Sequence, residues 1–333
     1  MKKKLLAVLI GGVMVMTCLF GCGKSDKNTV AKNDDVTTEN AEETTKNVNT
    51  EETTTEKEEI QSTKAPEEDT PIEYEIIQKD CYYYIGGDEY DSANTLSAGD
   101  VMPLQPQDGD VYETPDYLYV YMESKSSNYP SGWEVISTDT SKYGEIREVI
   151  ASEPVVYMIA TFWAADELVE APAIPDTVEY MIGTFTGADN LKTVPNLPNN
   201  LVEMTAAFFE CDNLEEVPEI PSSVEIMDIA FYYSGIVNAP NIPANVRTMV
   251  ATFGECSKLT GEIVFDANPE DYIGCFMNVD FIEQNLTFAG KTNLEPELRA
   301  SRNDTGYISD YDVKDYYDAV MNEIMTGEMA SQE

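Results

Sequence analysis

The sequence predicts a β-rich solenoid of 23-residue repeats, with a small N-terminal β cap and a C-terminal helix. Three observations lead to this expectation. Phenylalanines recur in the second half of the chain at spacings of 23, 23, 23, 22 and 23 residues. Other apolar positions and two proline positions keep the same register. The composition also changes abruptly near residues 22 and 73, which divides the chain into segments.

The N-terminus has the features of a secretory signal. Lys2–Lys4 precede the apolar run Leu5–Leu19, which is too short for a spanning helix and leads into Phe-Gly-Cys22. This ending resembles a bacterial lipoprotein signal, in which lipid is attached to the cysteine. The resemblance implies a signal peptide over residues 1–21, lipid on Cys22 and anchorage at the extracellular face of a bacterial cell membrane. Cleavage at a nearby ordinary signal site, or a retained N-terminal anchor, is the alternative.

Residues 22–72 are expected to be a disordered acidic tether. Residues 23–70 contain no aromatic side chain and are rich in Thr, Glu, Asn and Lys. Such a segment cannot bury enough apolar surface to offset the entropy of ordering. As a flexible coil, about fifty residues reach on the order of 40 Å. We expect this segment to hold a folded domain away from the membrane; a solubilising tail is the alternative.

Residues 73–144 are expected to form a β-rich cap over the first repeat. Tyrosine alternates with aliphatic residues in Asp116–Met122, as in a strand covered on both faces. Tyr82–Ile85 and Trp133–Ile136 lie next to glycines and are further strand candidates. Core packing is the favoured interpretation of these aromatic residues, and contact with sugar rings is the alternative.

The repeat occupies residues 145–290. A unit of 23 residues is too small to bury its own apolar side chains, so neighbouring units must stack and share a core. Two proline rows remove backbone donors at one side of each unit, which favours strands at the other side. The rows are Phe162, Phe185, Phe208, Phe231, Phe253 and Phe276; Met158, Met181, Met204, Met227 and Met249; Pro172, Pro195, Pro218 and Pro240; and Pro175, Pro198, Pro221 and Pro243. The expected strands are Thr177–Met181, Asn200–Met204, Ser223–Met227 and Asn245–Met249.

These rows resemble leucine-rich repeats of the BspA type, which occur in bacterial surface proteins and lipoproteins. The shared pattern is Val-x-x-Met/Ile-x-x-x-Phe-x-x-Cys-x-x-Leu-x-x-x-Pro-x-Ile-Pro. The chain departs from this pattern at Ala165 and Ala188, which replace the cysteine, and at Ser234–Ile236, which is one residue short. The resemblance implies a right-handed solenoid of stacked strands and a role in adhesion or protein binding.

The cysteines of the repeat are expected to be packing residues. Cys211 and Cys256 occupy equivalent positions two units apart, so their Cα atoms should lie roughly 10 Å from each other. A disulfide requires a separation of less than about 7 Å. We therefore expect two free, buried thiols.

Residues 291–333 are expected to form a C-terminal cap. Val313, Tyr316, Val320 and Ile324 follow helical spacing, which predicts a helix over about residues 312–325. We expect this helix to cover the last repeat.

The composition excludes several classes of function. The chain has 62 Asp and Glu against 20 Lys and Arg, a net charge of −42, and no histidine. This charge disfavours nucleic acid as a partner. The absence of histidine excludes Ser-His and Cys-His catalytic pairs and the usual zinc sites. A single Asp304-Thr305-Gly306 lacks the second aspartate of an aspartic protease. We expect no enzymatic activity, no metal and no cofactor.

The expected function is that of a lipid-anchored surface protein that binds an extracellular protein or glycan. The alternatives are a structural spacer without a specific ligand and, less favoured, a solute-binding lipoprotein, although the sequence shows no sign of two α/β lobes. An exposed aromatic or apolar patch would favour binding, whereas a uniformly charged face would favour the spacer. Side chains that face outward from the expected strands are the ligand-binding candidates: Glu179, Tyr180, Glu203, Glu225, Ile226, Arg247 and Thr248.

Overall fold

The computed structural model describes residues 81–84, 94–96, 106–138, 143–150, 153–304 and 313–328, all within one compact unit. The expected signal peptide, the tether and Cys22 lie outside the described residues. The strands are β1 Cys81–Tyr84, β2 Asn94–Leu96, β3 Val111–Glu113, β4 Tyr117–Met122, β5 Gly132–Ser137, β6 Val149–Ile150, β7 Glu153–Tyr157, β8 Gly261–Phe265 and β9 Leu286–Gly290. The helices are α2 Glu295–Ala300, the 3-10 helix η3 Ser301–Asn303, and α3 Val313–Thr326.

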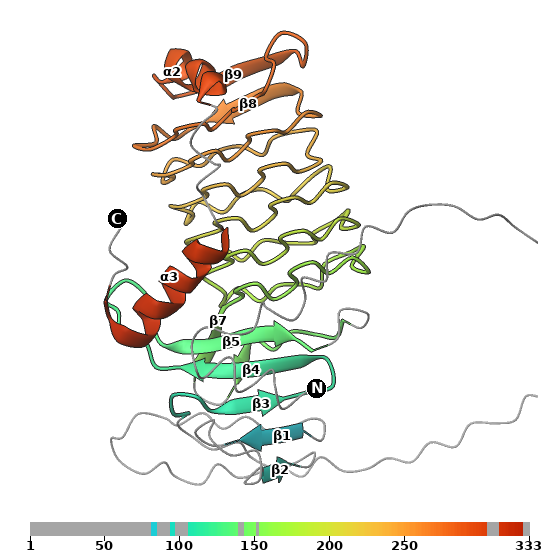
Figure 1. Ribbon diagram of the computed structural model, residues 1–333, viewed down its shortest axis with the longest axis vertical. Helices are drawn as coiled ribbons and strands as arrows, with labels where there is room; N and C mark the ends of the chain where they lie inside the picture. Colours follow the sequence, from blue (N-terminus) through green and yellow to red (C-terminus); the bar gives the residue numbers. More distant parts are fainter. Residues whose placement is uncertain are drawn as a thin grey trace, which may run out of the picture. The chain divides into compact units, whose positions relative to one another are not determined.

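A seven-stranded sheet forms the N-terminal region, in the order β2-β1-β3-β4-β5-β7-β6. All six residues of β4 are buried, as the alternation of tyrosine and aliphatic residues predicts. β5 pairs in parallel with β7, so that Trp133 lies opposite Val155. Because β7 belongs to the first unit of the repeat, the sheet continues directly into the stacked units (Figure 1).

Backbone hydrogen bonds join each unit of the repeat to the next. The N–H groups of Met158 and Met181 donate to the carbonyls of Tyr180 and Glu203, each at 2.9 Å. Within each expected strand, one residue forms a parallel bridge to the neighbouring unit. The strands do not extend to the expected five residues. A left-handed residue three positions after the bridge, with φ of +60° at Gly183 and +54° at Ala206, ends the extended backbone on that side. The bridging residues are Tyr157, Tyr180, Glu203, Ile226, Thr248 and Asp271.

The phenylalanines of the repeat form a ladder inside the stack. Neighbouring rings from Phe162 to Phe276 are stacked, with centroids 5.2–5.6 Å apart and interplanar angles of 3–15°. The rings are fully buried, together with the methionine row that begins at Met158. The prediction that these rows share one core is therefore confirmed.

The last units, which lack the two proline rows, form regular β-pairing. Ile263 and Asp266 occupy the positions of the two proline rows, and there a full strand, β8, pairs in parallel and in register with all five residues of β9. Proline lacks a backbone donor, so regular pairing appears where proline is absent.

The C-terminal segment covers the last unit with α2 and η3. Leu298 is buried in the core, and the Arg299 guanidinium lies over the rings of Phe281 and Phe288, at 5.1 and 4.6 Å from their centroids. The N–H of Phe276 donates to the Ser301 hydroxyl at 3.2 Å. These contacts terminate the stack.

The helix predicted over residues 312–325 is α3, but the prediction of its location was wrong. α3 lies beside the first units and the N-terminal sheet (Figure 1). Val320 and Ile324 are buried in a cluster with Tyr157, Tyr180 and Ile182. These apolar side chains point away from the main core, and α3 buries them, whereas α2 already covers the last unit.

Cys211 and Cys256 are free and buried, as expected. Their thiols donate to the carbonyls of Phe185 and Phe231 at 3.1 and 3.0 Å. Burial raises the pKa of both thiols, which makes them unreactive packing residues.

Candidate binding surfaces

Tyr180 and Glu203 were expected to be exposed, and both are buried. They do point away from the main core, as the strand alternation requires, but α3 covers them. The ring of Tyr180 packs between those of Tyr157 and Tyr129, with both centroid distances at 5.2 Å. The first part of the predicted face is therefore an internal contact, not a free surface.

Two fully buried carboxyl groups lie in this region. Glu203 Oε1 accepts hydrogen bonds from the hydroxyls of Tyr316 on α3, at 2.6 Å, and Thr205, at 2.9 Å. Glu134 on β5 has one oxygen without a hydrogen-bond partner, and burial raises its pKa to about 8. Burial also raises the pKa of Glu203. Burial therefore favours the protonated form of Glu134 at neutral pH, and it shifts the pKa of Glu203 in the same direction, against the two hydrogen bonds that Glu203 accepts.

The rest of the predicted face is partly exposed and largely charged. Arg247 donates from Nη2 and Nε to Glu225 Oε2, at 2.8 and 3.0 Å. Ile226 and Thr248 lie beside this ion pair in the bridging row. Asp228, in the same region, accepts a hydrogen bond from the Val250 N–H, and burial raises its pKa to about 6.

Glu179 is half-buried at the near edge of this face, and burial raises its pKa. The seven sequence candidates thus divide into two covered residues and five along a charged strip. In this strip Arg247 and Glu225 form an ion pair with each other, and Ile226 is the one apolar side chain.

A second surface was missed by sequence reasoning. The residue after each ladder phenylalanine lies outside the main core, and in three units it is aromatic: Trp163, Phe209 and Tyr232. Tyr232 is buried in a small second cluster, and Trp163 and Phe209 are partly buried against it. The rings of Phe209 and Tyr232 are stacked at 5.5 Å and 19°, and Tyr233 meets Tyr232 edge-on at 5.2 Å. Tyr233 is 49% exposed. We call Trp163, Phe209, Tyr232 and Tyr233 the aromatic patch.

The aromatic patch does not follow the repeat, so the period of the sequence does not reveal it. Equivalent positions hold Thr186, Gly254 and Met277. Gly254 makes room for the Tyr232 ring, because a Cβ there would lie 2.8 Å from two ring carbons. A comparison of the residues just after each Phe, for aromatic character rather than for period, would have found it.

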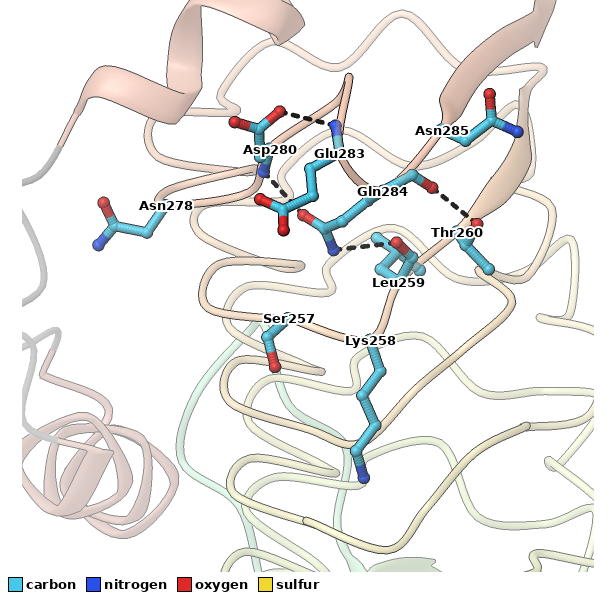
Figure 2. Close-up of a pocket in the computed structure, with 9 residues that line it drawn as sticks. All are labelled: Ser257, Lys258, Leu259, Thr260, Asn278, Asp280, Glu283, Gln284 and Asn285. Atoms are coloured by element: carbon cyan, nitrogen blue, oxygen red, sulfur yellow. Dashed lines mark hydrogen bonds between the residues drawn. The ribbon is translucent and has the colours of Figure 1, made fainter.

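A shallow polar pocket of about 510 Å³ lies near the last units (Figure 2). Gln284 Nε2 donates to the carbonyls of Cys256 and Leu259, and the Thr260 hydroxyl donates to the Gln284 carbonyl. Asp280 accepts two backbone N–H groups of its own loop. Since these polar groups are used in joining the units, the pocket has a structural role.

Within the described ranges, no group of three or more His, Cys, Asp or Glu side chains could hold a metal ion. No helix there is long and apolar enough to span a bilayer.

No protein-family model and no curated protein matches the chain. Among the solved structures that are similar to it are two leucine-rich repeat proteins. A leucine-rich repeat protein of T. pallidum is 19% identical with a TM-score of 0.41, covering 56% of this chain and 94% of that protein. A leucine-rich repeat protein from Bacteroides ovatus is 17% identical with a TM-score of 0.36, covering 54% of this chain and 57% of that protein. Structural neighbours of the chain are thus bacterial leucine-rich repeat proteins.

Proposed function

We propose that this chain is a lipid-anchored bacterial surface protein of the BspA type, whose leucine-rich repeat solenoid binds an extracellular protein or glycan. The proposal places lipid on Cys22 and the folded part outside the cell membrane, with residues 22–72 as the tether, and assigns no enzymatic activity. Its support for anchorage is the basic and apolar N-terminus that ends in Gly21-Cys22.

The aromatic patch is the observation that carries the binding function. Large aromatic side chains on an outer surface mark interaction sites when the core does not require them. In this stack the interior phenylalanine ladder is complete in every unit, and the outer aromatic residues occur in some units only. Tyr232 is buried in a small outer cluster, and Tyr233 beside it presents a half-exposed ring that a partner could contact.

A structural spacer without a ligand is the second candidate. The charged strip around Arg247 and Glu225 favours it, because paired surface charges need no partner. A spacer does not account for Tyr233, which is half exposed among aromatic neighbours. A solute-binding lipoprotein is less favoured, since the described residues form one stack and not two α/β lobes.

The test uses the purified full-length chain, offered separately to a panel of extracellular matrix proteins and to a glycan array. We expect saturable binding to at least one ligand, and loss of that binding on Tyr233→Ala. Ile282→Ala is the matched control, because Ile282 is 90% exposed and lies outside the aromatic patch. Binding of no ligand would favour the spacer, and equal loss in both variants would show that the aromatic patch does not carry the binding.

Anchorage is tested separately by acyl labelling in cells. Wild-type chain should incorporate a clickable fatty acid and fractionate with membranes, and Cys22→Ala should do neither. Unchanged labelling of Cys22→Ala would contradict the lipoprotein assignment.

A further inference from the structure

Tyr233 stands in line with two glutamates. Glu210, Tyr233 and Glu255 occupy the same position in three successive units, two residues after the ladder phenylalanine. The Glu210 N–H donates to the Tyr232 carbonyl at 2.9 Å, and the Tyr233 N–H donates to the Gly254 carbonyl at 3.0 Å, so the units are direct neighbours. All three residues share a left-handed backbone, with φ of 56°, 59° and 60°. Their side chains therefore leave the stack at one corner, with the ring between the carboxylates.

The electrostatics of the aromatic patch are negative. Burial raises the pKa of Tyr232 to about 12, and the charges of Glu255 and Glu210 contribute to this shift. Burial also raises the pKa of Glu210, with further contributions from Asp189 and Asp212. Several carboxylates thus act on this corner together.

No cation of the described ranges neutralises the two glutamates. Neither Glu210 nor Glu255 forms an ion pair there, and Glu255 accepts a hydrogen bond from the Asn278 amide instead. Lys258 is nearby in the stack, but its ammonium donates to the Asp212 carbonyl at 2.9 Å. The corner therefore combines the half-exposed ring of Tyr233 with two carboxylates that form no ion pair in the described ranges.

We infer that the aromatic patch binds a cationic segment of a partner protein, with an arginine or lysine side chain between Glu210 and Glu255 and against the ring of Tyr233. The inference rests on the proposed binding function and specifies its partner. A guanidinium fits such a corner, because it is flat and weakly hydrated, stacks on aromatic rings and pairs with carboxylates. The net charge of −42 would also attract a basic partner over long range.

Glycans fit this corner less well. A neutral sugar gains from the rings but not from two unpaired carboxylates, and an acidic glycan is repelled by them. The charge complementarity thus favours a basic protein segment.

The experiment measures binding of a nona-arginine peptide to the full-length chain by fluorescence anisotropy, with nona-citrulline as the neutral peptide. The chain is compared with Tyr233→Ala and with the double variant Glu210→Gln, Glu255→Gln. Glu262→Gln with Glu270→Gln is the matched control, since both residues are exposed and the same charge is removed. Ala164 has φ of 52° at the position equivalent to Tyr233, so the alanine variant fits the backbone, and unfolding midpoints verify folding.

We expect Tyr233→Ala and the patch double variant each to weaken nona-arginine binding by about tenfold, and the control to change it by less than about twofold. Nona-citrulline should not bind. Equal weakening by the two double variants would show general attraction by an acidic surface and overturn the inference, as would unchanged binding of Tyr233→Ala. An extracellular ligand that requires Tyr233 but neither glutamate, such as a neutral glycan, would overturn the cationic partner and leave the proposed function standing.

Discussion

Two rows of residues run through the same units, one residue apart. The inner row is aromatic in every unit, and the outer row is aromatic in three. Phe208 points inward and Phe209 outward, as do Phe231 and Tyr232. The inner row is phenylalanine in every unit, because each ring must stack on the next to fill a continuous core. The outer row holds Trp, Thr, Phe, Tyr, Gly and Met in turn. Stacking fixes the first row, whereas the second varies from unit to unit.

Breaking the inner row should have the largest effect. Phe208→Ala leaves a cavity between two stacked rings and should lower the free energy of unfolding by roughly 3 to 5 kcal/mol. Phe209→Ala removes a half-buried ring and should cost about 1 kcal/mol. Urea unfolding of the two variants measures this difference. Equal losses would show that the outer row is as structural as the inner one.

The period explains which parts of the molecule could be predicted from the sequence. The ladder, the free thiols and the lengths of the units follow from residues that recur, because stacking places equal residues in equal surroundings. The aromatic patch does not recur, so no alignment of the units against one another reveals it. Tyr180 and Glu203 point outward as expected, but α3 covers them. Helical spacing shows that α3 has an apolar face, and it does not show which surface that face will meet.

A third set of rings, the tyrosines beneath α3, differs from both rows because it surrounds buried carboxyl groups. Glu134 lies near Tyr157 and Tyr317, and its pKa is raised to about 8. Between the ordinary pKa of glutamate and about pH 8, the folded chain therefore keeps a proton on Glu134, whereas the unfolded chain has released it. The contribution of Glu134 to the free energy of unfolding is therefore fully present at low pH and is lost as the pH rises toward 8.

Between about pH 5.5 and 7.5 this single proton should reduce the free energy of unfolding by roughly 2 to 3 kcal/mol. Glu134→Gln should remove that loss, since the amide does not ionise. Chemical unfolding at the two pH values measures the slope. Glu123→Gln, on the exposed end of the same region, should keep the wild-type slope. A wild-type slope in Glu134→Gln would show that Glu134 is ionised in the folded chain.

The smallest expected effect is an increase, not a decrease, in the free energy of unfolding. Tyr233 has φ of 59°, a conformation that costs an ordinary residue roughly 1 to 2 kcal/mol and that asparagine adopts more readily. Asn278 holds the equivalent position in the last unit with φ of 57°. Tyr233→Asn should therefore raise the free energy of unfolding by about 0.5 kcal/mol while it weakens ligand binding. Tyr272→Asn, a partly buried tyrosine with no positive φ, should lower stability instead.

Thermal unfolding of Tyr233→Asn, measured beside Phe209→Ala, separates two reasons for keeping an aromatic residue outside the stack. If Tyr233→Asn were clearly less stable than wild type, the ring of Tyr233 would be part of the packing, as the ring of Phe209 is. A gain in stability with loss of binding would mean that the chain keeps a strained tyrosine that its fold does not need. Such a residue is retained for what it touches in a partner.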